Sequence, residues 1–266
     1  MSVHCVIPAR YASARYPGKP LAPLRGATGE SRTLIERTWR AAMAAPCFDH
    51  VHIATDDARI ARTARDFGAS VIMTSDRARN GTERCAEALG HLGDDIEMVV
   101  NLQGDAPLTP PRFLDALVNG LRADPEAALA TPILRCDGTA LAMLKADRAA
   151  GRIGATTVVT DSVRRALYFS KEVLPPTPAL PETAAATPVF LHVGIYAYRP
   201  WVLRAYSDWS VGPLERSEGL EQLRVLEAGH AVACVEVAAQ GDRFWELNNP
   251  EDIPRIEAML SEMGMA

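Results

Sequence analysis

The sequence predicts an α/β fold with a mainly parallel sheet and helices on both faces. Over the first half of the 266 residues, short apolar runs of strand length alternate with segments whose apolar residues recur at helical spacing. The composition, 48% apolar and 23% charged, is that of a globular protein able to bury a sizeable core. Alternation of this kind builds a parallel sheet, because each helix returns the chain so that the next strand runs in the same direction.

The first half supplies four strands and three helices in alternation. The strands are short apolar runs, expected at residues 4–9, 49–57, 70–75 and 96–105. The helices have apolar residues on one face and are expected at residues 32–45, 58–69 and 81–92. Ser31 is the expected N-cap of the first helix, and Gly68 suits a glycine stop for the second.

The second half predicts a smaller, β-rich region. Short strands without long helices between them are expected at residues 128–134, 155–161, 165–170, 189–199 and 231–237. The proline- and alanine-rich stretch 175–188 is typical of a surface loop. One amphipathic helix is expected at 214–229, ended by Gly229, and a terminal helix begins with Asn249 as N-cap and Pro250 in its first turn. No repeat or linker divides the chain, so a single domain, 1–266, is expected.

Composition excludes several classes of protein. The net charge of −5 disfavours a general nucleic-acid binder, which is usually basic. Five scattered cysteines show no metal or redox spacing and indicate reduced, mostly buried thiols in a cytoplasmic protein. The first apolar stretch is interrupted at Arg10, so it is neither a signal peptide nor a membrane span. We therefore expect a cytoplasmic enzyme or binding protein.

The segment VIPARYASARYPGKPL, residues 6–21, is a cationic loop in an acidic protein. Arg10, Arg15 and Lys19 lie on a stretch stiffened by proline and glycine, with no acidic residue among them. It matches neither the dinucleotide glycine motif nor the Walker motif. The guanidinium group of arginine binds an oxyanion through two parallel hydrogen bonds, and lysine adds a compact positive charge, so both suit a polyphosphate. A stiff loop also loses less conformational entropy when a ligand binds. A solvated surface loop is the alternative, but ligands gather at the carboxyl ends of parallel strands, where this loop falls.

Two other polar stretches follow expected strands. These are residues 55–57 (TDD) and 103–105 (QGD), and both are expected to converge with the cationic loop on one crevice. Asp105 follows a hydrophobic strand and is the best candidate for a magnesium carboxylate. Magnesium takes one or two protein carboxylates and completes its shell with phosphate and water. A turn aspartate with no ligand is the equal alternative on local sequence alone.

These motifs, in order along nearly the whole chain, resemble those of the CMP-Kdo synthetases, the cytidylyltransferases that activate 3-deoxy-manno-octulosonate (Kdo). The matching stretches are IPARYASARYPGKPL, ATDD, NGTERCAEAL, VVNLQGDAPL, ALYFS, HVGIYAYR, LERSEGLEQLRVL and NNPEDI. The resemblance implies a Rossmann-like sugar-nucleotidyltransferase fold, Mg²⁺ dependence and a homodimer. It implies transfer of CMP from CTP to a sugar acid with release of pyrophosphate, for cell-surface polysaccharide synthesis. Residues 1–125 would form the nucleotide-binding half, and 126–266 the acceptor-binding and dimerisation half.

The resemblance also implies roles for individual residues. Arg10, Arg15 and Lys19 would hold the triphosphate and act in catalysis. The other nucleotide-binding residues would be Pro8, Ala9, Ser13, Thr82, Arg84 and Gln103. Asp105 and Asn248 stand at the two metal positions. The acceptor-binding residues would be Lys171, His192, Tyr196, Glu221 and Gln222. Core packing for Tyr196 and a solvated helix face for the glutamate and glutamine remain the alternatives from local sequence.

The chain departs from the family pattern mainly on the metal and acceptor sides. The family's G-V-D-T-P-E-D is here ELNNPED, which puts Asn248 where the family has a second metal aspartate, so either the metal site is weaker or another acid such as Glu246 substitutes. Lys171 replaces an arginine, Ala106 replaces an acid, and the loop after Leu21 is about five residues longer, as surface loops tolerate.

The cationic loop is unchanged, so the sequence predicts cytidylyl transfer to Kdo, to a related keto-sugar acid or to another small acid. A non-catalytic nucleotide-binding homologue is the main alternative from another class. A nucleotidyltransferase that uses another base or a sugar phosphate is a second. A dinucleotide-dependent oxidoreductase is more distant, because the glycine motif is absent.

Overall fold

A computed structural model describes the chain except for residues 14, 153–154, 178–185 and 239–244. The chain divides into two compact units. Unit 1 comprises Met1–Asp115, Arg199–Arg204 and Gly241–Ala266. Unit 2 comprises Ala116–Tyr198 and Ala205–Gln240. Both ends of the chain therefore belong to unit 1, and the chain passes between units within α4 (Pro111–Ala123) and α6 (Pro200–Tyr206).

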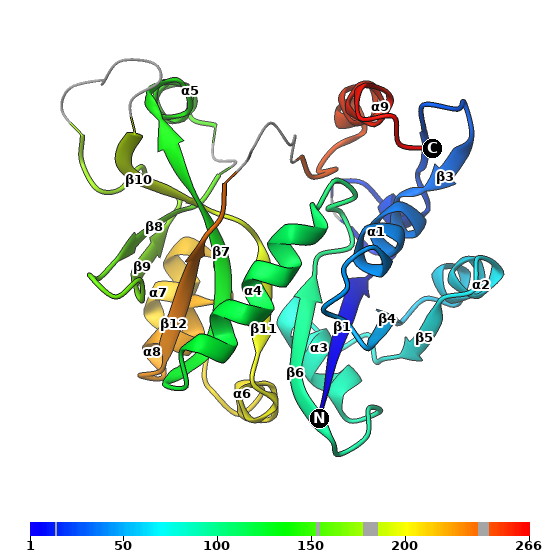
Figure 1. Cartoon of the computed structure of the whole chain (residues 1–266), viewed down its shortest axis with the longest axis horizontal. Coiled ribbons are helices and arrows are strands. Elements are labelled where there is room, and N and C mark those ends of the chain that lie inside the picture. The colour runs from blue at the N-terminus through cyan, green and yellow to red at the C-terminus, as the bar shows by residue number, and fades with distance from the viewer. Residues whose placement is uncertain (14, 153–154, 178–185, 239–244) are drawn as a thin grey trace. The chain divides into compact units, whose positions relative to one another are not determined.

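Unit 1 contains the predicted parallel sheet. Its strands lie in the order β5 (Ser70–Met73), β4 (His50–Thr55), β1 (Ser2–Ala9) and β6 (Ile96–Leu102), all parallel (Figure 1). The chain steps outward from β1 to β5 and then returns to the other side of β1. This reversal is a topological switch point, where the loops after β1 and β6 diverge and leave a crevice at the carboxyl ends of the strands.

Three helices connect these strands: α1 (Leu34–Met43), α2 (Ala58–Asp66) and α3 (Gly81–Leu89). Because such crossovers are right-handed, the return from β5 to β6 places α3 on the face opposite α1 and α2. Thr33 caps α1 by accepting from the Glu36 backbone N–H at 3.3 Å. The predicted Ser31 N-cap is wrong, because Ser31 lies in β3 (Ser31–Thr33), which pairs with β2 (Pro23–Arg25).

The C-terminal segment packs on this unit. Asn249 is the N-cap of the 3₁₀ turn η2 (Pro250–Asp252), as predicted, and the Asp252 carboxylate accepts from its backbone N–H at 2.7 Å. The turn leads into α9 (Ile253–Glu262), which packs against β2, the strand paired with β3 (Figure 1). One core cluster joins residues of β2, α1 and α9 with single residues of three loops: Ala22, Leu24, Leu34, Leu108, Leu247, Ile256, Met259 and Leu260.

Unit 2 is a mixed sheet around one long strand, β7 (Ala127–Asp137). β7 pairs antiparallel with β10 (Ala186–His192) and β11 (Ile195–Tyr198) and parallel with β12 (Ala231–Glu236). β8 (Thr157–Thr160) joins β10 to β9 (Ala166–Ser170) by antiparallel pairing. The expected β-rich region is present, and residues 189–199 form two strands rather than one.

Several predicted elements of this half are wrong. Helix α5 (Gly138–Ala149) lies between β7 and β8, where no long helix was expected; its buried face is narrow, so its periodicity is weak. The expected helix at 214–229 is two short helices, α7 (Pro213–Glu218) and α8 (Leu223–Glu227), because Gly219 adopts φ +63° and ends the first. Of the expected loop 175–188, residues 186–188 belong to β10 and 178–185 lie outside the described part.

The five cysteines carry free thiols, and all but the half-buried Cys47 are buried, as predicted. Across the described residues, the longest apolar helices fall short of what a membrane crossing requires.

A cluster of imidazoles joins the two central strands of unit 1. His4 Nδ1 lies 3.1 Å from His52 Nε2, and His52 Nδ1 lies 2.9 Å from Ser70 Oγ. The His50 ring is 4.7 Å from that of His4. Burial and then the nearby charge of His4 lower the pKa of His52 to about 4, whereas Asp49 opposes the decrease in the pKa of His4. His52 is therefore neutral in the folded protein near pH 6.

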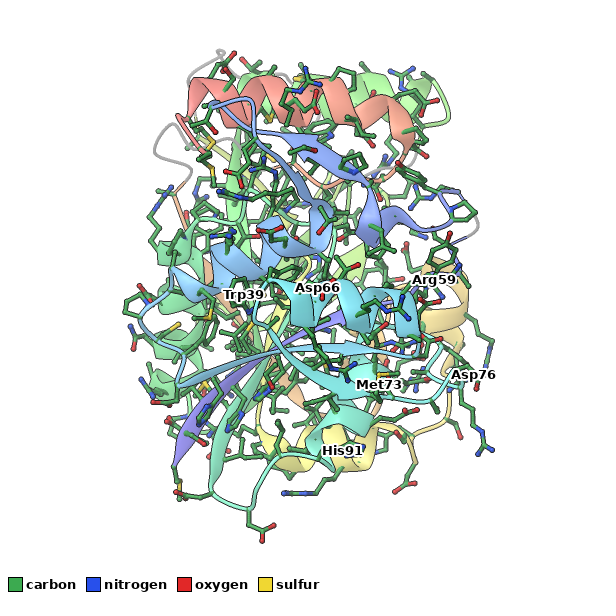
Figure 2. The ribbon with its side chains drawn as sticks, turned by 90° about the vertical axis from the view of Figure 1, so that its right-hand side faces the viewer. Trp39, Arg59, Asp66, Met73, Asp76 and His91 are labelled. Carbon is green, nitrogen blue, oxygen red and sulfur yellow. The ribbon has the colours of Figure 1, made fainter. Side chains whose placement is uncertain are left out.

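This predicts acid sensitivity between about pH 6.5 and pH 4. The unfolded imidazole titrates near pH 6.5, so over this interval the unfolded state binds more protons and the free energy of unfolding falls as the pH falls. His52→Asn is expected to flatten this dependence, measured by urea unfolding at several pH values. His91→Asn, which changes an exposed histidine labelled in Figure 2, is the control and keeps the wild-type slope. An unchanged slope in His52→Asn contradicts the explanation.

Candidate active site

The crevice at the switch point of unit 1 is a cavity of about 370 Å³. Three segments form it: the loop after β1, the first turn of α3 and the turn after β6. The lining residues are Pro8, Ala9, Arg10, Ser13, Arg15, Lys19, Pro20, Ala78, Arg79, Asn80, Gly81, Arg84, Gln103, Gly104 and Asp105. The volume falls in the range of small-ligand sites. The structure therefore brings together most of the residues that the sequence assigned to a nucleotide.

The loop after β1 is held in shape from outside the cavity. The Gly18 backbone N–H donates to the Tyr11 carbonyl at 2.9 Å and closes the loop. The guanidinium of Arg59, at the start of α2 (Figure 2), stacks over the Tyr11 ring, 3.3 Å from its centroid. The Asp57 carboxylate accepts hydrogen bonds of 3.1 Å and 2.6 Å from that guanidinium, and these bonds lower the pKa of the Asp57 carboxyl. These contacts restrain the loop at Tyr11 and Gly18.

The turn after β6 approaches the end of β1 very closely. A Cβ on Gly104 would lie 2.7 Å from the Pro8 carbonyl oxygen, so only glycine allows this approach. The Gly104 carbonyl accepts from the Thr38 hydroxyl of α1 at 3.2 Å. Directly after it, Asp105 Oδ2 pairs with Lys19 Nζ at 2.6 Å. This ion pair joins the two loops at the base of the cavity.

The cavity carries an excess of positive charge. Arg10 and Arg15 are exposed in the loop after β1. Arg79 pairs with Glu83 at 2.5 Å, and the buried Arg84 lies 3.3 Å from Asp56. The N-terminal end of α3 adds the positive end of a helix dipole at the same wall. This arrangement favours a polyanion.

A short C-terminal segment, Glu246–Asn248, lies beside Asp105. The Leu247 backbone N–H donates to the Asp105 carbonyl at 2.9 Å, and Arg15 Nη2 donates to Asn248 Oδ1 at 3.1 Å. Glu246 is partly buried; burial first, and then the charge of Asp105, raise the pKa of Glu246, while a hydrogen bond from the Asn248 amide opposes the rise. Asp105 lines the cavity, and Glu246 and Asn248 lie on the segment bonded to its backbone.

This donor set fits Mg²⁺, a hard cation that prefers oxygen and takes one or two protein carboxylates. In the described part of the chain, no three His, Cys, Asp or Glu residues are grouped so as to hold a metal ion by themselves. That also agrees with an ion whose remaining ligands are phosphate oxygens and water.

The other predicted nucleotide residues have distinct positions. Gln103 lines the cavity, and its amide donates to Asn101 Oδ1 at 3.4 Å. Thr82 is buried in the first turn of α3 and is absent from the lining. Residues 55–57 are also absent from the lining: Asp56 pairs with Arg84, and Asp57 caps α2 at 2.9 Å from the Arg59 N–H. Their effect on the cavity is therefore indirect.

Three of the predicted acceptor residues meet in unit 2. The His192 and Tyr196 rings lie 5.5 Å apart, and the Tyr196 hydroxyl donates to Gln222 Oε1 at 3.1 Å. His192 Nε2 and Gln222 Nε2 are buried and, among the described residues, have no hydrogen-bond partner. Burial lowers the pKa of His192 to about 3, so the imidazole is neutral. Two buried polar atoms on residues that both contact Tyr196 are what a polar ligand would satisfy.

The segments that carry these residues are firmly held. Arg224, 2% exposed, makes a bidentate ion pair with Glu215 at 2.6 Å and 2.7 Å, which joins α8 to α7 next to Gln222. The Glu221 carbonyl accepts from the Tyr206 hydroxyl at 2.9 Å.

Lys171 lies next to a half-buried acid, Glu218. Burial opposes ionisation of Glu218, but bonds from the Lys171 N–H (2.8 Å), the Ser170 hydroxyl (2.7 Å) and the Tyr168 hydroxyl lower its pKa. The Lys171 ammonium lies near Gly219, 3.2 Å from where a Cβ would be. Because His192 is neutral, Lys171 is the cationic member of the predicted acceptor group.

Sequence reasoning missed several residues of the site. Arg79, Asn80 and Gly81 line the cavity, and Asn80 caps α3 by accepting from the Glu83 N–H at 2.8 Å. The stretch NGTE, with a glutamate three residues after the asparagine, carries a recognisable capping signal. The Tyr11–Arg59 contact has no such signal, since the two residues are distant in sequence.

Comparisons with known proteins agree with this geometry. Residues 4–236 match the family model described as cytidylyltransferase. A 3-deoxy-manno-octulosonate cytidylyltransferase of Maricaulis maris is 41% identical over 99% of both chains. A mitochondrial one of Arabidopsis thaliana is 38% identical over 98% of this chain and 84% of its own length.

The fold matches solved structures of related enzymes. A CMP:2-keto-3-deoxy-manno-octonic acid synthetase complexed with CTP has a TM-score of 0.84 at 32% identity, covering 99% of this chain and 100% of that one. The inositol-1-phosphate CTP transferase of T. maritima, at 11% identity and TM-score 0.64, covers 99% of this chain and 96% of its own and shares the fold.

The stacking of Arg59 on Tyr11 predicts an effect on affinity from outside the cavity. Arg59→Ala is expected to weaken CTP binding roughly three- to tenfold, because the loop loses a cation–π contact that fixes its shape. Isothermal titration calorimetry measures this effect. Arg62→Ala, an exposed arginine on the same helix, is the matched control with unchanged affinity. Equal affinity of both variants contradicts the role given to Arg59.

Proposed function

This chain belongs to the cytidylyltransferase family, and on that premise we propose that it transfers CMP from CTP to Kdo, releasing pyrophosphate. The observation that carries the proposal is the preformed cationic cavity at the switch point of unit 1. It collects Arg10, Arg15 and Lys19 on a loop whose shape is set by contacts outside the cavity. The two relatives named above, at about 40% identity, support Kdo as the acceptor in lipopolysaccharide synthesis.

The chemistry follows from phosphoryl transfer. The acceptor hydroxyl attacks the α-phosphorus of CTP, the bond from the α-phosphorus to the bridging oxygen breaks, and pyrophosphate leaves in line. Little covalent chemistry falls to the protein, so catalysis consists of positioning and charge stabilisation. Lys19 and the two arginines bind the triphosphate and stabilise the charge that develops on the leaving pyrophosphate. Gln103, at the opposite wall, offers an amide that can pair with the edge of a base.

Mg²⁺ is the proposed cofactor. Asp105, Glu246 and Asn248 would hold it with phosphate oxygens. When bound, it would neutralise phosphate charge and polarise the α-phosphate. Lys19, paired with Asp105 at 2.6 Å, fixes the orientation of that carboxylate.

The acceptor is proposed to bind in unit 2. Lys171 would meet the carboxylate of the sugar acid, while the neutral His192, Gln222 and Tyr196 would hydrogen-bond its hydroxyl groups. Glu221 completes the proposed group. A lysine recognises a carboxylate as a point charge, without the bidentate fork of an arginine, so it tolerates more varied acids.

A homodimer in the cytoplasm is part of the proposal. The free cysteines support a reducing compartment. The dimer follows from the family resemblance.

Two substitutions test the proposed function. Lys19→Ala and Asp105→Ala are each expected to lower turnover by roughly a hundredfold or more, because the first removes a cation that stabilises the leaving pyrophosphate and the second removes a carboxylate that would hold Mg²⁺. The measurement is pyrophosphate release with CTP and Kdo. Asp66→Asn, an exposed acid on α2 labelled in Figure 2, is the control with wild-type turnover. Near-normal rates in both site variants, or no CMP-Kdo from the wild-type protein, refute the proposed function.

A further inference from the structure

The strand register of unit 2 brings Lys171 and His192 to the same end of the sheet. β8 lies between β10 and β9 (Figure 1), and Thr157 of β8 pairs with Leu191 on one side and Ser170 on the other. Because both pairings are antiparallel, β10 and β9 run in the same direction. The residues that follow the two paired positions, His192 and Lys171, therefore lie in one row at the carboxyl ends of their strands.

The backbone of Lys171 is held on both sides. Its N–H donates to Glu218 Oε2 at 2.8 Å, and its carbonyl accepts from Arg148 Nε of α5. The other carboxylate oxygen of Glu218, Oε1, accepts from the Ser170 hydroxyl at 2.7 Å and from the Tyr168 hydroxyl at 3.2 Å. These bonds fix the point from which the lysine side chain leaves the backbone.

The helix that carries Glu218 is anchored at both of its ends. At the start of α7, the Leu214 and Glu215 backbone N–H groups each donate to the Glu227 carboxylate at 3.0 Å. At its end, the Gly219 N–H donates to the Glu215 carbonyl at 2.7 Å. Glu218 is therefore a fixed support for the end of β9.

The ammonium group of Lys171 remains available to a ligand. Glu218 bonds to the lysine backbone, and within the described residues the Lys171 ammonium forms no ion pair. Gly219 leaves room beside it, since a Cβ at that position would lie 3.2 Å from Lys171 Nζ. A half-buried ammonium in the same row as His192 suits the carboxylate of a small acid.

From these contacts, and resting on the proposed function, we propose that Glu218 is a positioning residue for the acceptor. It acts through Lys171: by holding the lysine backbone, it directs the ammonium toward the carboxylate of the incoming sugar acid. Without this bond, the ammonium would occupy a wider range of positions, and binding the acceptor would cost more conformational entropy. Arg148 supports the same peptide from the opposite side.

A double-mutant cycle tests this role. Affinity for Kdo is measured by isothermal titration calorimetry, with the α,β-methylene analogue of CTP present so that no pyrophosphate is released. Glu218→Gln keeps the size of the side chain but accepts weaker bonds, so it is expected to weaken Kdo binding roughly fivefold while affinity for the CTP analogue stays unchanged. In a Lys171→Met background, the same exchange is expected to weaken Kdo binding by less than about twofold, because the group it positions is gone.

Glu172→Gln, the exposed acid next to Lys171, is the matched control for the change of charge and keeps wild-type affinity for Kdo. Two results overturn the proposal: a Kdo affinity of Glu218→Gln within about twofold of wild type, or a loss that is equally large with and without Lys171. A wild-type protein that binds no Kdo overturns it as well.

Formation of CMP-Kdo by the wild-type protein, with CTP in place of the analogue, is measured separately. A protein that binds Kdo but forms no CMP-Kdo removes the proposed function, whereas the double-mutant cycle still decides the role of Glu218.

Discussion

The ion pair between Lys19 and Asp105 is the constraint on which the site depends. Lys19 Nζ, in the loop after β1, lies 2.6 Å from Asp105 Oδ2, in the turn after β6. The pair therefore joins the two loops that diverge at the topological switch point. Both side chains are largely shielded from water, 15% and 23% exposed, so the pair is less screened than a surface pair. A strand order that reverses at β1 opens the crevice, and this pair fixes the distance between its two walls.

Around that pair, the site separates the groups that bind phosphate from the groups that shape the loop. Arg10 and Arg15 face the cavity, whereas Tyr11 is held by Arg59 from behind. A loop ordered in advance does not lose conformational entropy when the ligand binds, and this saving increases affinity. The cationic loop follows the family pattern, and the departures of this chain fall at positions proposed to bind the metal and the acceptor, among them Asn248 and Lys171.

Much of unit 1 could be predicted from the sequence, because its strands are continuous apolar runs and its helices have apolar residues at helical spacing. The cationic loop and Asp105 were found for the same reason: both follow buried strands. The Ser31 cap was wrong because a nearby threonine, Thr33, offers the better bond to Glu36. Contacts between distant residues, such as that of Arg59 with Tyr11, leave no local pattern.

Unit 2 was harder to predict. Helix α5 buries a narrow face, so periodicity did not reveal it, and the left-handed Gly219 divides a segment that reads as one continuous helix. The acceptor group depends on this break, because Glu221 and Gln222 lie just after it, in the turn that leads into α8. The orphaned nitrogens of His192 and Gln222 are visible only in three dimensions.

The loop of residues 6–21 is proposed to bind the triphosphate of CTP in the shape that it already has without CTP. Crystal structures of the protein with and without CTP test it most directly. The account predicts triphosphate oxygens within hydrogen-bond distance of Arg10, Arg15 and Lys19, with the same loop backbone and the same Arg59–Tyr11 stack in both structures. A triphosphate bound elsewhere, or a loop that takes this shape only when CTP is bound, would contradict it.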